Sequence, residues 1–135
     1  MAALTADRPT PKREGKMLSL PVAASTLIYA GGIVCVNASG WATKGAVATT
    51  LKTVGVAVER ADNSAGANGA IQVRVERGTW LMANSGGGDL IARADIGTQC
   101  FVVDDQTVAK TNGGSTRSVA GIVRDVDAAG VWVEF

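Results

Sequence analysis

The stretch Ile71-Gln72-Val73-Arg74-Val75-Glu76 indicates the fold class, because its side chains alternate strictly between aliphatic and polar. Successive side chains of a strand point to opposite faces, so the stretch predicts a strand with one buried and one wet face. Residues 54–58 alternate likewise, with valines set against smaller residues. Such half-buried strands are typical of antiparallel sheets.

Outward from this stretch, the chain consists of short apolar runs bounded by Gly, Asn, Asp or Pro, a pattern that predicts strands. These runs are residues 17–20, 26–29, 33–36, 41–44, 54–60, 70–77, 79–82, 100–104, 107–110, 118–125 and 131–135. Turns are expected at 37–40, 104–106 and 127–130, and one short helical turn, capped by Asp89, at 89–94. The chain is therefore expected to be all-β, forming a compact antiparallel β-barrel or sandwich.

The chain also repeats itself, since residues 31–77 and 96–135 present similar segments in the same order. For example, Ala42-Thr43-Lys44 recurs as Val108-Ala109-Lys110, and each cysteine, Cys35 and Cys100, lies three residues after the glycine that opens its copy. An internal duplication of one β-unit explains these matches. The glycine-rich stretch Ser85–Asp89 is then expected to be a flexible connector between the copies.

Length and composition favour one β-domain, residues 17–135, preceded by an extended arm, residues 1–16. The chain has 135 residues, 17 glycines and a formal net charge of +1, too little charge to call for nucleic acid or a membrane as partner. The arm holds two of the three prolines and shows no apolar periodicity. It lacks the apolar run of a signal peptide, so we expect synthesis in the cytosol, where both cysteines are free buried thiols; a Cys35–Cys100 bridge is the less favoured alternative.

Catalytic chemistry is not expected. The chain contains no histidine, which removes the Ser-His-Asp and Cys-His arrangements and the common zinc sites. Asp104, Asp105, Asp125 and Asp127 are interpreted as turn formers, not as paired catalytic carboxylates or calcium ligands. A Ser-Lys pair stays open, although Lys44 and Lys110 are best explained as solvated strand ends. We expect no catalytic residue, no cofactor and no metal.

The three tryptophans are interpreted differently. Trp132, flanked by valines, is expected to anchor the core. For Trp80, core packing and an exposed contact with a partner subunit are equally favoured. Trp41 fits either role.

Several segments resemble the capsid decoration (cement) proteins of tailed bacteriophages, encoded among the head genes of Mu-like phages and related siphophages. The resemblance covers the chain from about Tyr29 to the C-terminus and consists of glycine and turn patterns. The segments that carry it are Leu27–Gly32, Thr53–Ala57 with Asp62–Gly66, Ala94–Gly97 with Val103–Val108, and Gly130–Val133.

The resemblance implies a tulip-like β-domain that adds to the outer surface of the expanded capsid, typically as a homotrimer, and bridges neighbouring capsomers. The implied partner is the major capsid protein, and the implied location is the virion, after synthesis in the bacterial cytoplasm. An extended N-terminal arm often contributes in such proteins. The candidate capsid-contact residues are accordingly Arg8, Pro9, Pro11, Lys12, Arg13 and Lys16, with Trp80 as a possible subunit contact.

Two other functions are weighed against this one. A small carbohydrate- or receptor-binding module of a phage tail or fibre is expected to show an exposed aromatic cluster, for which the chain has six aromatic residues. A hydrolase that uses Ser or Asp without histidine is the least favoured alternative.

Overall fold

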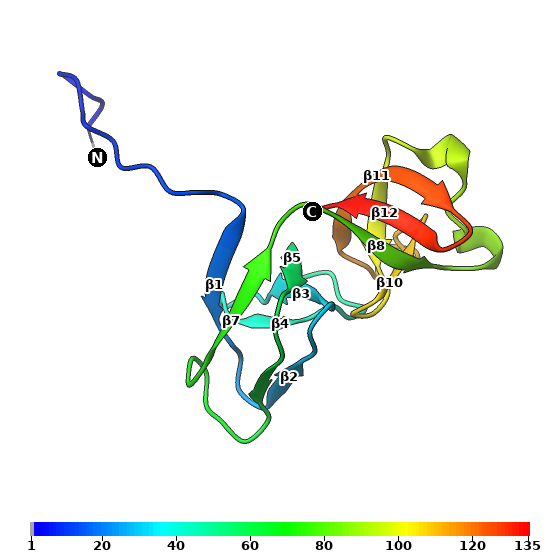
Figure 1. The fold of residues 1–135 in the computed structure, drawn as a ribbon, viewed down its shortest axis with the longest axis horizontal. Coiled ribbons are helices and arrows are strands. Elements are labelled where there is room, and N and C mark those ends of the chain that lie inside the picture. Colours follow the sequence, from blue (N-terminus) through cyan, green and yellow to red (C-terminus); the bar gives the residue numbers. More distant parts are fainter. Residues whose placement is uncertain (1) are drawn as a thin grey trace.

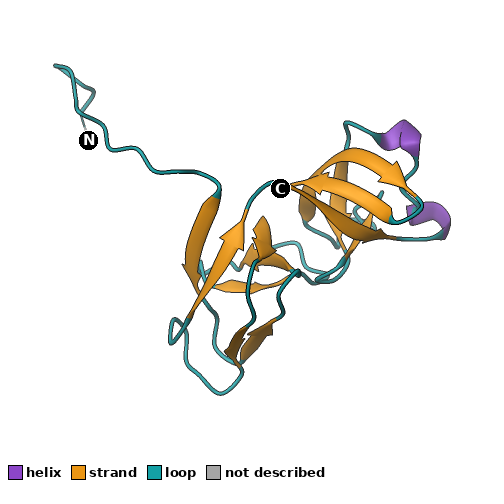
Figure 2. Ribbon diagram, in the orientation of Figure 1, coloured by secondary structure: helices purple, strands orange, loops and turns teal. Residues whose placement is uncertain are grey.

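The protein, described by a computed structural model over residues 2–135, is all-β, with two short 3-10 turns besides its strands (Figure 2). The strands of a first half, residues 17–77, are β1 (Met17–Pro21), β2 (Thr26–Ile28), β3 (Ile33–Val36), β4 (Ala42–Lys44), β5 (Lys52–Ala57), β6 (Ala61–Asn63) and β7 (Gln72–Glu76). The strands of a second half, residues 79–135, are β8 (Thr79–Asn84), β9 (Gln99–Val102), β10 (Thr107–Ala109), β11 (Val119–Asp127) and β12 (Gly130–Glu134). The 3-10 turns, Gly87–Asp89 and Arg93–Asp95, lie between β8 and β9. Within the described residues, none of the helical turns has the length and apolarity needed to cross a membrane.

The two halves share one topology, as an internal duplication would produce, over residues 17–77 and 79–135 instead of the 31–77 and 96–135 expected from the sequence. The first half forms a sheet in the order β1-β7-β5-β3-β4, and the second a barrel in the order β8-β12-β11-β9-β10, closed by parallel pairing of β10 with β8. Every other neighbouring pair in both orders is antiparallel. The closing contact recurs in the first half as a single parallel bridge between Val22 and Ala42. Thus β1, β7, β5, β3 and β4 correspond to β8, β12, β11, β9 and β10.

The pairing registers set the correspondence residue by residue. In the first half Val34 pairs with Gly55, and in the second Cys100 pairs with Gly121. Cys100 therefore corresponds to Val34, and Cys35 corresponds to Phe101, so the equal spacing of the cysteines from a glycine is not a structural equivalence. Both cysteines are buried free thiols, as expected.

The glycine-rich stretch Ser85–Asp89 does not connect the halves, so that prediction is wrong. Strand β8, which precedes it, pairs with β12 and belongs to the second half. The chain passes from the first half to the second at Gly78, whose carbonyl accepts the Phe135 amide at 2.8 Å. Likewise, Asp89 does not cap a helical turn over the following residues; it ends the first 3-10 turn, and its carboxylate contacts Thr111 and Arg117.

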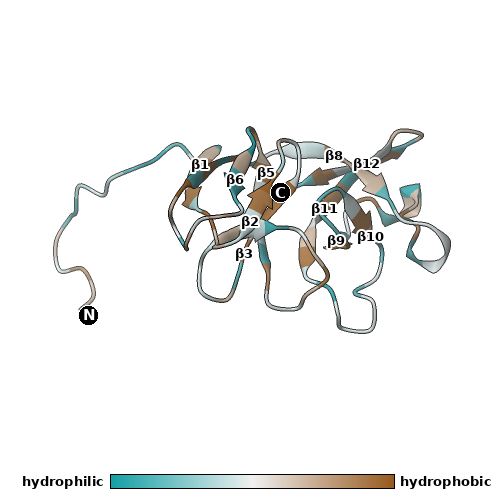
Figure 3. Ribbon diagram, turned by 90° about the horizontal axis from the view of Figure 1, so that it is seen from below, coloured by the Kyte–Doolittle hydropathy of each residue, from teal (hydrophilic) through white to brown (hydrophobic). Residues whose placement is uncertain are grey.

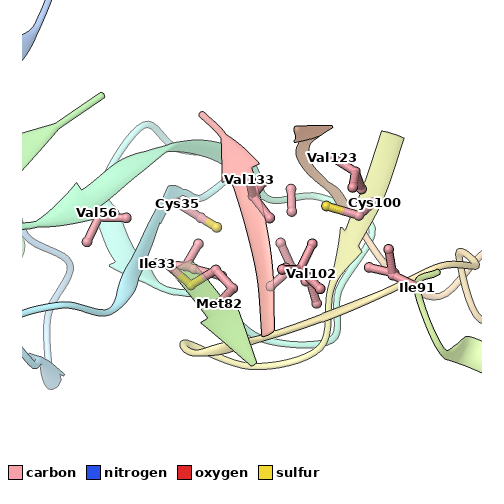
Figure 4. Close-up of a cluster of buried hydrophobic side chains, with 12 residues drawn as sticks. Ile33, Cys35, Val56, Met82, Ile91, Cys100, Val102, Val123 and Val133 are labelled. Atoms are coloured by element: carbon pink, nitrogen blue, oxygen red, sulfur yellow. The ribbon is translucent and has the colours of Figure 1, made fainter. Parts of the chain in front are cut away.

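Two apolar clusters form the core. One fills the first half and includes Val34, Val73 and Val75. The other fills the second half, includes Met82 and Val133, and extends to Ile33, Cys35 and Val56 of the first half (Figure 4). The alternation of residues 71–76 is confirmed, because Val73 and Val75 are buried while Gln72 and Arg74 are exposed. The shared second cluster ties the two halves together.

Candidate functional site

The N-terminal arm is the most prominent surface feature, because it projects away from both halves as a mostly hydrophilic segment without secondary structure (Figures 1 and 3). Residues 2–16 are all exposed. Within the described arm, residues 2–15 form no hydrogen bond or ion pair with either half, and the backbone bond inside the arm joins the Thr10 amide to the Arg8 carbonyl at 2.8 Å. The arm is thus held by its base and not along its length.

The base of the arm is fixed at one residue. The Lys16 carbonyl accepts the Arg77 amide at 2.9 Å, and Lys16 Nζ lies 3.1 Å from Glu76 Oε1. The Lys16 side chain is 66% exposed, so this ion pair adds little stability but sets where the arm leaves the sheet. Strand β1 then begins directly at Met17, paired with β7.

The six candidate contact residues lie along this arm. Arg8, Lys12 and Arg13 have no carboxylate within ion-pair distance among the described residues, whereas Lys16 has Glu76. Pro9 and Pro11 fix their own φ angles and disfavour helix in the residues before them, and the bond from the Thr10 amide to the Arg8 carbonyl makes a tight turn at Pro9. The arm therefore presents three cations without an ion pair among the described residues, beside the acidic Asp7 and Glu14, on a segment stiffened by its prolines.

Trp80 lies in β8, partly buried against the core of the second half. Its indole Nε1 is shielded from solvent and has no hydrogen-bond partner within residues 2–135. At this position Trp80 packs against the core of the second half. A role in subunit contact stays a prediction.

Trp132 does not anchor the core, so that prediction is wrong. Its strand neighbours Val131 and Val133 are fully buried, and alternation along β12 places Trp132 on the outer face of the barrel. There it pairs across the sheet with Leu81, and its Nε1 donates to Asp127 Oδ2 at 3.0 Å. Trp41 lies partly buried over the turn at Gly69.

Asp104 and Asp127 form turns at strand ends, as interpreted from the sequence, whereas Asp125 lies inside β11 and is not a turn former. Asp104 Oδ1 accepts the amides of Gln106 and Thr107 at 2.9 and 2.8 Å. The hydrogen bond from Trp132, followed by one from the Ala129 amide, lowers the pKa of Asp127. Asp125 Oδ1 lies 3.5 Å from Arg93 Nη1 and accepts the Val126 amide at 2.8 Å. Residues 2–135 contain no group of three or more Cys, Asp or Glu side chains arranged to hold a metal ion.

A second exposed feature joins Tyr29 and Arg60. Antiparallel pairing of β2 with β6 places Ile28 opposite Ala61 and so brings these two neighbours together. The Arg60 guanidinium lies 5.5 Å from the centre of the Tyr29 ring, and Tyr29 is 53% exposed beside a shallow hollow lined also by Asp105 and Gln106. Sequence patterns carry no signal for this pair, because β6 is too short and polar to be predicted as a strand.

Comparisons with protein-family models, with curated proteins and with solved structures find no match for this chain.

Proposed function

We propose that this chain is a structural virion protein that binds the outer surface of an expanded phage capsid and stabilises it by bridging capsomers. The observation that carries the proposal is the arm, fifteen described residues that leave the body at Lys16 without other attachment. Fully extended, such a segment spans about 50 Å, enough to reach across a neighbouring subunit. The resemblance to decoration proteins described above supports the same function.

The mechanism is thermodynamic linkage. A ligand that binds the expanded lattice and not the unexpanded or ruptured shell lowers the free energy of the expanded state. The β-body supplies a rigid block at one capsomer while the arm engages the next. Because the second contact forms within an already bound molecule, two weak contacts give tight overall attachment.

The arm residues have different roles in capsid binding, which follow from their chemistry. Arg8, Lys12 and Arg13 attract an acidic strip of the major capsid protein and donate hydrogen bonds to its carboxylates. Pro9 and Pro11 reduce the entropy that the arm loses when it becomes ordered on the capsid. Lys16 keeps its ion pair with Glu76 and orients the arm.

Co-sedimentation tests the proposal. The full chain is mixed with expanded, DNA-free capsids and, separately, with unexpanded procapsids of the phage that encodes it, and bound copies per capsid subunit are counted by densitometry. We expect saturable binding to expanded capsids alone. The triple variant R8E/K12E/R13E should fold normally and bind at least tenfold more weakly, whereas K44E/K52E, which changes exposed charges on the body, should bind as the unmodified chain does. Equal binding of both variants would remove the arm from the mechanism, and absence of binding to either shell would remove the function.

The second candidate is a carbohydrate- or receptor-binding module, favoured by the exposed Tyr29 beside Arg60, Asp105 and Gln106. An aromatic ring with nearby carboxylate and amide groups is a common way to hold a sugar. Calorimetric titration with host surface glycans would detect it. Saturable binding lost in Tyr29→Ala would favour this module, and no heat of binding would exclude it for the glycans tested.

A further inference from the structure

The first half carries an apolar outer face that the second half covers. Ile33 and Cys35 of β3 and Val56 of β5 point away from the core of their own half, yet each is at most 1% exposed. They pack in the cluster that contains Met82 and Val133 of the second half (Figure 4). Thr53, which pairs with Cys35 on the same face, donates its hydroxyl to the Val119 carbonyl at 2.9 Å. This face is the intramolecular joint between the halves.

The second half repeats this face in part, and there its side chains remain partly exposed. By register, Cys35 corresponds to Phe101, Val56 to Ile122 and Thr53 to Val119, whereas the counterpart of Ile33 is Gln99, which is polar and exposed. Phe101 pairs directly with Val119 across the sheet, so the two side chains are neighbours on the outer face. Val119 is 41% exposed, and Phe101 and Ile122 are partly exposed. The second half therefore repeats the joint face in part, with three apolar side chains that stay partly exposed.

The receiving surface is also present twice. On the second half, the cluster at the joint includes Met82 and Ala120, with Trp80 packed against it. Their counterparts on the first half are Leu20, Val54 and Leu18. Leu18 and Val54 are partly exposed and line an open hollow together with Thr53, Arg77 and Phe135.

The outer pair Leu81 and Trp132 has no apolar equivalent in the first half. Its counterparts in the first half are Ser19 and Arg74, which are polar and exposed, and Arg74 lies 3.7 Å from Glu59. No joint within the described chain uses this face.

We propose that a second copy of this chain covers the face formed by Phe101, Val119 and Ile122. This face lies against the Leu18–Val54 hollow of the second copy, in the same arrangement in which the first half lies against the second half within one chain. Such a contact is head to tail, because it joins different surfaces of the two copies. Repetition of a head-to-tail contact closes a ring or extends a filament. The inference rests on the fold and its repeat and does not depend on capsid binding.

Sedimentation equilibrium and light scattering on the full chain test this surface. We expect the unmodified chain to form an oligomer and V119D to be a monomer with an unchanged far-UV spectrum. V47D, which places the same charge on a side chain that is 55% exposed and outside both surfaces, should keep the oligomer. An unmodified chain that is monomeric at every concentration, or a V119D variant that keeps the oligomer, would overturn the proposal.

Mixing two defective variants distinguishes a head-to-tail contact from a symmetric one. V119D has a damaged face and an intact hollow, whereas V54D has an intact face and a damaged hollow; R77D, on the exposed rim of the same hollow, replaces V54D if V54D does not fold. Each variant alone should be monomeric. Their mixture should form dimers and nothing larger, since one intact contact is available per pair. A mixture that stays monomeric, or an oligomer that is lost in L81D and kept in V119D, would contradict the proposed surface.

Discussion

Gly55 and Gly121 occupy the same place in the two halves, each against the carbonyl of the glutamate that ends the strand paired with its own. A Cβ on Gly55 would lie 2.7 Å from the Glu76 carbonyl oxygen, and one on Gly121 would collide with the carbonyl oxygen of Glu134. Neither carbonyl can move away without breaking its sheet. Glycine at these two positions therefore permits the close approach on which both halves depend.

Replacement of Gly121 by alanine should destabilise the protein. The added methyl group meets backbone atoms and Val133, so the strands must separate, at a cost of about 1–3 kcal/mol. Gly88→Ala is the matched control, because a methyl group added there would meet nothing within 4 Å. Urea unfolding should show a lower midpoint for G121A and a midpoint close to that of the unmodified chain for G88A. Equal midpoints would mean that β11 and β12 adjust freely at this point.

The repeat can be recognised from the sequence, but its register cannot. The register shift lies at the same place in β3–β5 and β9–β11, so it belongs to both copies. The counterpart of Gly97 is Gly31 and not Gly32, because the Gly31 and Gly97 amides bond the equivalent carbonyls of Ala57 and Val123. Spacing from a glycine matches Cys35 with Cys100, whereas the sheets match Cys35 with Phe101. Which of two adjacent glycines matches the other copy is decided by pairing between distant strands, which a single run of residues does not encode.

The strands that are hardest to place from the sequence are those with unlike partners in the repeat. Residues 71–76 are predicted correctly because alternation alone determines which side faces the core. Strands β1 and β8 occupy equivalent positions, but Met17-Leu18-Ser19-Leu20 and Thr79-Trp80-Leu81-Met82 share few side chains, so sequence similarity does not assign β8 to the half to which it belongs. The size of Trp132 suggests a place in the core, although the valines on either side of it already occupy the inward positions.

Asn63 should be the most sensitive polar residue of the first half. It is 2% exposed, and its Nδ2 donates to the carbonyls of Ala23 and Ala67 at 2.9 Å. Asn63→Leu leaves these acceptors without a donor in a buried site, which should cost about 2–4 kcal/mol. Asn68→Ala, which removes one bond to the exposed Ala24 amide, is the control and should cost at most about 1 kcal/mol. Comparable losses in thermal unfolding for the two variants would contradict the importance assigned to Asn63.

Asp127 should titrate below the ordinary range of an aspartate. The Trp132 indole donates to this carboxylate and lowers its pKa, so the ionised form is favoured in the folded protein. Its stabilising contribution is therefore present above the pKa of about 3.9 that the unfolded chain shows, and is lost as pH falls through the lower folded value. The indole N–H resonance of Trp132, followed by NMR against pH, should report this transition. The pH-dependent change of this resonance should be absent in D127N. A midpoint at or above the ordinary pKa of an aspartate would contradict the lowered pKa of Asp127.

Cys100 should be unreactive until the protein opens. Burial raises the pKa of this thiol to about 11, so at pH 8 about one molecule in a thousand carries the thiolate that attacks disulfide reagents. Cys35, fully buried in the joint between the halves, also has a raised pKa because of burial. In the native state a chromogenic disulfide reagent should therefore label neither residue on the timescale on which it labels an exposed thiol introduced by Val47→Cys.

The same shift gives a pH dependence with a definite sign. Because the folded pKa of Cys100 lies above the unfolded value of about 8.5, its contribution to stability is complete below that value and is lost as pH rises through the folded value. Cys100→Ala should flatten this alkaline loss, whereas Lys52→Gln, on an exposed side chain, should not. Addition of denaturant should release two equivalents of reactive thiol from the unmodified chain, one for each cysteine. Rapid labelling of both cysteines without denaturant would mean that the joint between the halves opens readily, and the covered face of the first half would then be no guide to a contact between copies.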